Sequence, residues 1–178
     1  IRLLDAVGLL RLMARFRRAG VNPMLPRGEA PGLAIGLGGV GLKLSDLVQL
    51  YTAFPNGGRI TMLHDKPLDR PASATLMEPQ AAWQVADILS GVRPPEGSRA
   101  TGIAYKTGTS YGYRDAWSIG FDGRHVLGVW VGRPDGGPVP GLAGYVSAAP
   151  ILFDAFAKSG LSVTPLPRAP AGALRMAR

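Results

Sequence analysis

The stretch "AYKTGTSYGYRDAWSIGFDGRHVLGVWVG", residues 104–132, determines the fold class that we expect for this chain. β-Branched, aromatic and small residues dominate it, and their spacing predicts strands over 101–109, 116–121 and 125–131. The "DGR" turn between the second and third of these strands is a hairpin signal. The third strand is apolar almost throughout, which predicts a central place in the sheet. Three antiparallel strands are therefore expected.

Helical patterns flank this stretch on both sides. The segments with helical spacing of apolar residues are 1–19, 46–54, 80–89 and 148–158. Ser45 is expected to cap the second helix, and Gly20 to end the first in a left-handed conformation. The order predicts an α+β fold, in which an antiparallel sheet is flanked by helices. The last segment, 161–178, is rich in proline and is expected to be a loose tail.

The composition is that of a globular domain and excludes several kinds of site. The chain has 178 residues, of which 46% are hydrophobic and 18% charged. It contains no cysteine, which excludes disulfides, thiolate metal sites and a cysteine nucleophile. Neither His64 nor His125 has a partner at the spacing that metal ligands show on a helix. We therefore expect neither a metal nor a cofactor.

The net charge of +8 could indicate a nucleic-acid partner, but its distribution argues against one. Residues 1–20 carry +4 and residues 160–178 carry +3, whereas 21–159 hold 12 basic and 11 acidic residues. A nucleic-acid domain typically has a basic face with aromatic residues in its folded part. Nucleic-acid binding is therefore not predicted.

The string "GLGGVG", residues 36–41, matches the glycine pattern of dinucleotide-binding loops. That pattern binds a cofactor when it follows a buried strand and opens a helix in a βαβ unit. Here Pro23, Pro26 and Pro31 precede it, and no strand–helix–strand unit follows. We interpret it as a glycine-rich loop.

The strand that holds Lys106 has the residues of an anion-binding wall. Alternation places Lys106 and Gly108 on one face, and Thr107 and Thr109 on the other. A glycine in a strand often marks a close approach by a ligand or another backbone. An extended ligand could pair with the edge of this strand, its carboxylate bound by the ammonium and hydroxyls, and Thr109 N–H could donate to a developing oxyanion. The alternative is an ordinary solvent-facing lysine.

The wider context of this strand resembles a known family. "YKTGTSYGYRDAWSIGF", the hairpin, "VLGVWVGRPDG" and the earlier "GLGGVGLKLSDLVQLYTAFPNGG" are similar to the C-terminal part of penicillin-binding transpeptidase domains, most of all class A enzymes of the penicillin-binding protein 1C type. The resemblance covers about residues 1–158. K-T-G is one of three signature motifs of that superfamily, with S-x-x-K and S-D-N. It implies a partial serine β-lactamase/DD-transpeptidase-like fold, with 1–160 as the C-terminal portion of the domain.

The sequence departs from the family pattern in one respect. No serine has a lysine three residues on, and none has an asparagine two residues on. The motifs that supply the acylated serine and the S-x-N element are therefore absent. The chain is expected to supply the anion-binding wall, to need the missing N-terminal part of the same domain, and to be inactive alone.

The resemblance implies roles for residues of the third motif, Lys106–Gly108. Thr107 and Thr109 would hold the carboxylate of a peptide donor or a β-lactam. Lys106 would supply positive charge, and Thr109 N–H half of an oxyanion hole. Tyr111 and its neighbour Tyr113 would line the cleft, although a packing role is equally open.

The pair Arg114–Asp115 is expected to be a structural ion pair or a turn cap rather than catalytic.

The function implied is that of a peptidoglycan DD-transpeptidase, which acylates its serine with a D-Ala-D-Ala stem peptide and is blocked by β-lactams. Such an enzyme would act in the periplasm or on the outer face of the inner membrane, anchored by a segment not in this chain. Two alternatives stay open: a serine β-lactamase or DD-carboxypeptidase relative, and a non-catalytic remnant or binding fragment.

Overall fold

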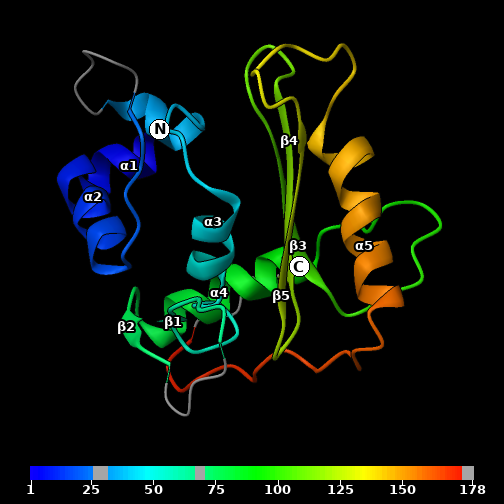
Figure 1. Ribbon diagram of the computed structural model, residues 1–178. Helices are drawn as coiled ribbons and strands as arrows, with labels where there is room; N and C mark the ends of the chain where they lie inside the picture. Colours follow the sequence, from blue (N-terminus) through cyan, green and yellow to red (C-terminus); the bar gives the residue numbers. More distant parts are fainter. Residues whose placement is uncertain (26–31, 67–70, 174–178) are drawn as a thin grey trace.

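A three-stranded antiparallel sheet stands between two helices in the computed structural model, which describes residues 1–25, 32–66 and 71–173. Helix α3 covers one face of the sheet and α5 the other (Figure 1). These elements are β3 (Ala104–Thr109), β4 (Asp115–Phe121), β5 (Val126–Gly132), α3 (Leu44–Tyr51) and α5 (Ala149–Lys158). The expected α+β fold, with helices on an antiparallel sheet, is confirmed.

The remaining elements lie around this layered centre. They are α1 (Arg2–Val7), α2 (Leu9–Arg18), the 3-10 turn η1 (Leu33–Leu37), β1 (Arg59–Thr61), β2 (Ser73–Thr75), α4 (Pro79–Ser90) and the π-helical turn η2 (Gly144–Ala148). Strands β1 and β2 form a separate two-stranded sheet. In the described residues, no helix has the length and apolar composition needed to cross a lipid bilayer.

The order of the main sheet is β3-β4-β5, so the prediction that the third strand is central was wrong. Strand β5 is apolar because helices cover both of its faces. A Cβ on Gly128 would lie 2.6 Å from Cγ2 of Val48, which shows how closely α3 packs on one face. On the other face, Leu127 and Val129 pack against the buried cluster of α5. The apolar composition of β5 therefore results from burial between two helices and does not indicate a central position in the sheet.

The predicted helix over residues 1–19 is interrupted at Gly8, which has φ +86° and separates α1 from α2. Gly20 has φ +70°, and Val21 N–H donates to Phe16 O at 2.9 Å, which confirms the predicted left-handed end of the first helical region. The pattern of apolar residues continues through Gly8, and this explains why periodicity alone missed the break.

Helix α3 begins one residue before Ser45, so the predicted capping role of that serine was wrong. Lys43 occupies the cap position, and its backbone N–H donates to a carboxylate oxygen of Asp46 at 3.2 Å. Asp46, an acidic residue in the first turn, therefore accepts the hydrogen bond of the backbone N–H at the cap position.

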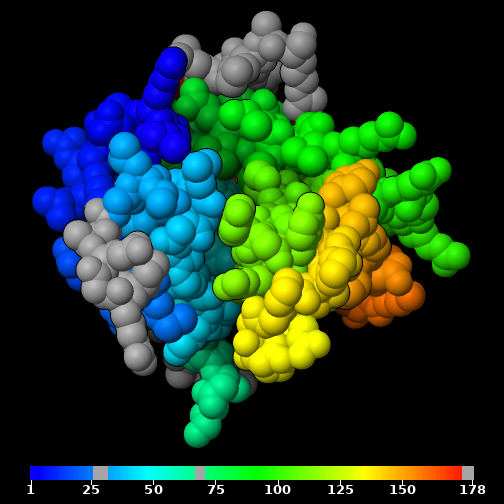
Figure 2. Space-filling view, turned by 90° about the horizontal axis from the view of Figure 1, so that it is seen from above, coloured from blue at the N-terminus to red at the C-terminus, as the bar shows by residue number. Residues whose placement is uncertain are grey.

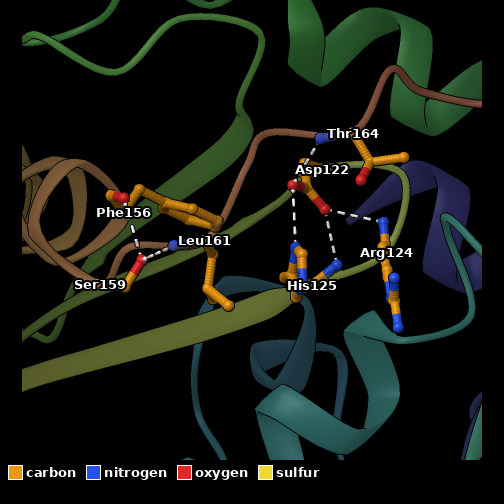
Figure 3. Close-up of polar contacts among 7 residues, drawn as sticks. All are labelled: Asp122, Arg124, His125, Phe156, Ser159, Leu161 and Thr164. Carbon is orange, nitrogen blue, oxygen red and sulfur yellow. Dashed lines mark hydrogen bonds and ion pairs between the residues drawn. The ribbon is translucent and has the colours of Figure 1, made fainter.

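The segment that follows α5 is held against the β4–β5 hairpin (Figure 3). Thr164 N–H donates to Asp122 Oδ2 at 2.9 Å, and Gly123 N–H donates to Thr164 O at 2.8 Å. Further along, the side-chain amide of Gln80 in α4 donates to Ala171 O at 3.1 Å. Residues 161–173 form no helix or strand, but the expectation of a loose tail was wrong for them. Residues 174–178 lie outside the described part.

Asp122 is the buried centre of this junction. Its Oδ1 accepts the backbone N–H groups of Arg124 and His125 at 2.7 and 2.6 Å, and Oδ2 lies 3.1 Å from His125 Nδ1. Burial opposes ionisation, but the hydrogen bonds from Thr164, His125 and Arg124 outweigh it and hold the pKa of the Asp122 carboxyl below its ordinary value. The aspartate thus ties the hairpin turn to the C-terminal segment.

Candidate functional site

A cleft of about 670 Å³ lies between β3 and the chain that leads into α3. Residues 106–111 line one side of it, and residues 34–40 line the other. Leu12 and Phe16 of α2 contribute to the same lining. Figure 2 looks onto this end of the molecule, where the yellow-green β3–β4 hairpin lies between the light-blue chain before α3 and the yellow chain before α5. The cleft brings together Lys106, Thr107, Gly108, Thr109 and Tyr111 as the sequence predicted, but its lining does not include Tyr113.

The strand alternates as predicted. Lys106 and Gly108 pair with Ile119 and Trp117, all four of which line the cleft. Their neighbours on β3 pair with Ser118 and Ala116 of β4, whose side chains are buried on the face covered by η2 and α5. The Lys106 side chain therefore faces the cleft. The two threonine side chains point to the opposite face of β3, but because β3 is an edge strand both residues also border the cleft.

The backbone N–H and C=O groups of Thr107 and Thr109 point to the outer edge of the sheet, away from β4. Ser110 N–H donates to Asp115 O at 3.0 Å, which marks these two residues as a hydrogen-bonded pair. Such pairs alternate along antiparallel strands, so the N–H and C=O groups of Thr107 and Thr109 face the outer edge of β3. In the described part of the chain, no strand occupies that edge. An extended ligand could add there.

Lys106 is exposed, and its Nζ donates to Thr107 O at 2.5 Å. Because this carbonyl points to the outer edge, the ammonium covers an acceptor that an added strand would use. A ligand that pairs with β3 must therefore take this carbonyl from the lysine, which frees the ammonium for an anion.

The hydroxyl of Thr109 accepts a hydrogen bond from Gly144 N–H at 3.0 Å. The buried hydroxyl of Ser118, opposite Thr107 in the register, has no hydrogen-bond partner in the described residues. Both hydroxyls lie on the sheet face covered by η2 and α5, directly behind the strand edge. Behind the strand, the Thr109 hydroxyl therefore has a hydrogen-bond partner, and the Ser118 hydroxyl has none among the described residues.

Gly108 meets the close approach that a strand glycine predicts, but the approaching group belongs to this chain. A Cβ on Gly144 would lie 2.5 Å from Gly108 O and 2.7 Å from Trp117 O. A Cβ on Gly108 itself would meet its nearest neighbour, Cβ of Trp117, at an ordinary 3.7 Å. Packing alone therefore leaves room for a side chain at position 108.

Tyr111 is fully exposed at the tip of the β3–β4 hairpin and lines the mouth of the cleft. This position rules out the packing role that the sequence left open for it. Tyr113 has φ +55°, and its carbonyl accepts Val139 N–H at 2.9 Å, which ties the loop before η2 to the hairpin.

Asp115 is structural, but not through an ion pair with its neighbour. Its Oδ1 accepts the indole N–H of Trp130 at 2.9 Å, across β4 and β5. Its backbone N–H donates to Ser110 Oγ at 2.8 Å and closes the turn. Among the described residues, the ion pairs do not include Arg114, so of the two structural roles expected the turn contact is present and the ion pair is not.

Two contributors to the site were missed by sequence reasoning. The string "GLGGVG" begins in the 3-10 turn η1 and continues as a loop, and residues 34–40 form the wall opposite β3. Gly144 lies 35 positions after Thr109, in a region that the sequence presents as a proline- and glycine-rich loop. No local signal connects either segment to the KTG strand.

The histidines lie outside the cleft lining, and the described residues contain no group of three potential metal ligands. His64 contacts the carbonyl of Lys66 through Nδ1, and His125 belongs to the hairpin junction.

Comparison with known proteins gives a consistent group of relatives. The chain is 44% identical over 156 residues to penicillin-binding protein 1C of Escherichia coli (strain K12), covering 85% of this chain and 20% of that protein. It is 29% identical over 151 residues to penicillin-binding protein 1B of Vibrio cholerae, covering 74% and 19%. The chain thus spans about a fifth of the length of these curated relatives.

The fold has a solved counterpart. The crystal structure of penicillin-binding protein 1A from Haemophilus influenzae matches with a TM-score of 0.70 and 19% identity, covering 95% of this chain and 34% of that one. No protein-family model matches the sequence.

Proposed function

The chain belongs to the penicillin-binding protein family, and from this premise we propose that it forms the C-terminal part of a peptidoglycan DD-transpeptidase domain. The observation that carries the proposal is the "KTGT" segment on an edge strand whose open backbone groups border a cleft. Residues 1–160 would form this part of the domain.

The proposed role of β3 is to bind and polarise an extended acyl donor. The donor would be a D-Ala-D-Ala stem peptide, or a β-lactam in its place. Its backbone pairs with the outward N–H and C=O groups of Thr107 and Thr109. Their hydroxyls and the ammonium of Lys106 hold its terminal carboxylate.

The chemical step is acyl transfer to a serine that this chain does not contain. That serine oxygen attacks the donor carbonyl, and the leaving D-Ala amine takes a proton. Thr109 N–H points along the open edge and stabilises the oxyanion that forms on the carbonyl oxygen. The acyl group then passes to an amine of a neighbouring peptidoglycan strand.

The site of action proposed is the outer side of the cytoplasmic membrane, where peptidoglycan lies. The missing part of the same domain is the proposed partner of the cleft, because it would bring the nucleophile to face β3. A non-catalytic binding fragment is the second candidate, since the cleft and the open edge of β3 could bind an extended peptide without acylation.

Labelling with a fluorescent penicillin tests the proposal. We expect no covalent adduct on the 178-residue chain, because none of its serines belongs to S-x-x-K. We expect an adduct when the chain is produced together with the protein segment encoded directly upstream of it.

Two results would contradict the proposal. One is a stable adduct on a serine of the chain alone, located by mass spectrometry. The other is a folded two-part protein that takes up no label, which would favour the binding fragment. Unlabelled penicillin in excess is the control for specific uptake.

A further inference from the structure

The turn η2 touches the KTG strand at the residue that carries the most chemistry in the proposed function. Gly144 opens this turn, after Ala143 in extended conformation, and its N–H donates to Thr109 Oγ1 at 3.0 Å. The turn itself is closed by Ser147 N–H, which donates to Ala143 O at 2.8 Å. Helix α5 follows directly, so the donor is attached to a packed element.

The residue at 144 must be glycine for this contact to exist. A Cβ there would lie 2.5 Å from Gly108 O, 2.7 Å from Trp117 O and 3.0 Å from Gly108 N. All three atoms belong to the backbone of paired strands and cannot move aside as a side-chain end could. Any larger residue would push the turn off the strand and lengthen the hydrogen bond to Thr109.

The hydrogen bond from Gly144 N–H determines which further hydrogen bonds the Thr109 hydroxyl can make. A hydroxyl has one proton to donate and two acceptor positions. Gly144 N–H occupies an acceptor position from behind the strand, which leaves the proton free for a group bound at the open edge of β3. A hydroxyl that accepts a hydrogen bond also becomes a better donor, since hydrogen bonds in series polarise one another.

We propose that Gly144 is a positioning residue, whose backbone N–H holds the Thr109 hydroxyl as a donor to the carboxylate of the acyl donor or β-lactam. The inference rests on the proposed function and adds a residue outside the K-T-G motif to the machinery. It predicts that the contribution of Gly144 depends on the ligand carboxylate and on the hydroxyl at 109.

Two changes remove the contact in different ways. Gly144→Ala displaces the turn, and replacement of the Ala143–Gly144 amide by an ester removes the donor while keeping the shape. In the two-part protein, both should slow acylation by benzylpenicillin about tenfold, the effect of one lost hydrogen bond to an anion-binding group. Acylation by the methyl ester of benzylpenicillin, which lacks the carboxylate, should change less than about twofold.

Coupling to Thr109 separates this role from simple packing. Thr109→Val should produce the same selective loss, and adding the ester at 144 to that variant should produce no further loss. Thr109→Ser, which keeps a hydroxyl, should restore most of the rate. Gly91→Ala is the matched control, because a Cβ at that helix end meets its nearest atom at 3.5 Å.

Equal loss with benzylpenicillin and its methyl ester, or no loss from the ester at 144, would overturn the inference. Hydrogen exchange in the 178-residue chain gives a readout that does not need acylation. The Gly144 amide should be protected, and should lose protection in Thr109→Val but not in Thr109→Ser. If the unmodified two-part protein is not acylated while this pattern holds, the proposed function has failed and the contact has not. An unprotected Gly144 amide in the folded chain would overturn the contact itself.

Discussion

At Lys106, the ammonium rests on the carbonyl of Thr107 rather than on an anion. That carbonyl faces the open edge of β3, where an extended ligand would donate an N–H to it. Ligand binding would therefore exchange one partner of the ammonium for another, a carbonyl for a carboxylate. The Lys106 ammonium thus has a carbonyl partner that a carboxylate, a stronger hydrogen-bond acceptor, could replace.

Replacement of this lysine tests its role. In the two-part protein, Lys106→Ala should reduce the rate of acylation by penicillin about ten- to a hundredfold, because charge-assisted hydrogen bonds contribute about 1.5–3 kcal/mol. Lys106→Arg should recover part of the rate, since its planar fork replaces a compact ammonium poorly. Stopped-flow measurement with a chromogenic cephalosporin would give the rates.

Thermal unfolding is the companion measurement, and it should change little, because Lys106 is exposed and outside the core. Lys158→Ala is a suitable control, since that lysine bonds to Asp154 on the exposed side of α5. Acylation of Lys106→Ala within twofold of the parent, with the fold intact, would identify the lysine as an ordinary surface residue.

The sequence could predict the residues of β3 but not what stands behind them. Lysine, hydroxyls and glycine at alternating positions are visible in five consecutive letters, and the strand period assigns their faces. The supporting donor is the backbone N–H of Gly144. Every residue except proline has such a group, so the sequence does not mark it. Its contact depends on how a 35-residue connection returns to the sheet.

Among the elements, the β4–β5 hairpin and the segment around Thr164 depend on one carboxylate. Asp122 accepts backbone N–H groups from the turn and from Thr164. These hydrogen bonds favour its ionised form and lower its pKa. A group whose pKa is lower in the folded state stabilises the fold above its unfolded pKa, about 3.9, and this contribution is lost as the pH falls through the folded value.

The pH dependence of stability should follow from this. In dilute samples of the chain, the free energy of unfolding should fall as the pH is lowered below about 4. Asp122→Asn should be less stable at pH 7 by about 1–3 kcal/mol, and its stability should change less between pH 4 and pH 2. Urea unfolding followed by tryptophan fluorescence measures both, and His125, the other titratable group at this carboxylate, is unchanged in the variant.

Asp154→Asn is the matched control, because its bond to Lys158 is exposed and should contribute less than about 1 kcal/mol. A wild-type acid dependence that survives unchanged in Asp122→Asn would assign the effect to other carboxylates.

At the same scale, the sequence predicted the helices and strands more reliably than their arrangement. The hairpin at "DGR" and the end of the first helical region at Gly20 followed from turn chemistry that is local. The break at Gly8 and the edge position of β5 did not. A single glycine fits within a periodic pattern, and burial by two helices produces the same apolar run as burial between two strands.

At the scale of the whole molecule, large apolar side chains are exposed on α1, α2 and η1. Leu3 and Leu10 are each 79% exposed, and Leu37, beside the cleft, is 74% exposed. Among the described residues, β5 also has no strand on its outer side. Exposed apolar surface of this kind marks faces that associate with another protein surface.

The 178-residue chain should therefore self-associate when produced alone. Size-exclusion chromatography with light scattering should show species larger than the monomer, and production with the upstream segment should reduce them. Leu10→Lys should raise the monomer fraction, since it places a charge on the exposed face of α2. Leu161→Lys, in the segment after α5, is the control and should have little effect. A monodisperse monomer with a sharp thermal transition would count against this prediction.

The bond between Asp122 and Thr164 also limits how the chain can be shortened. Its last residues look dispensable, since residues 159–173 form neither helix nor strand. Yet a protein ending at Gly160 would leave Asp122 Oδ2 without the Thr164 N–H and would remove Leu166 from the cluster around Phe121. Anyone trimming this protein for crystallisation or fusion should keep the sequence through Leu166.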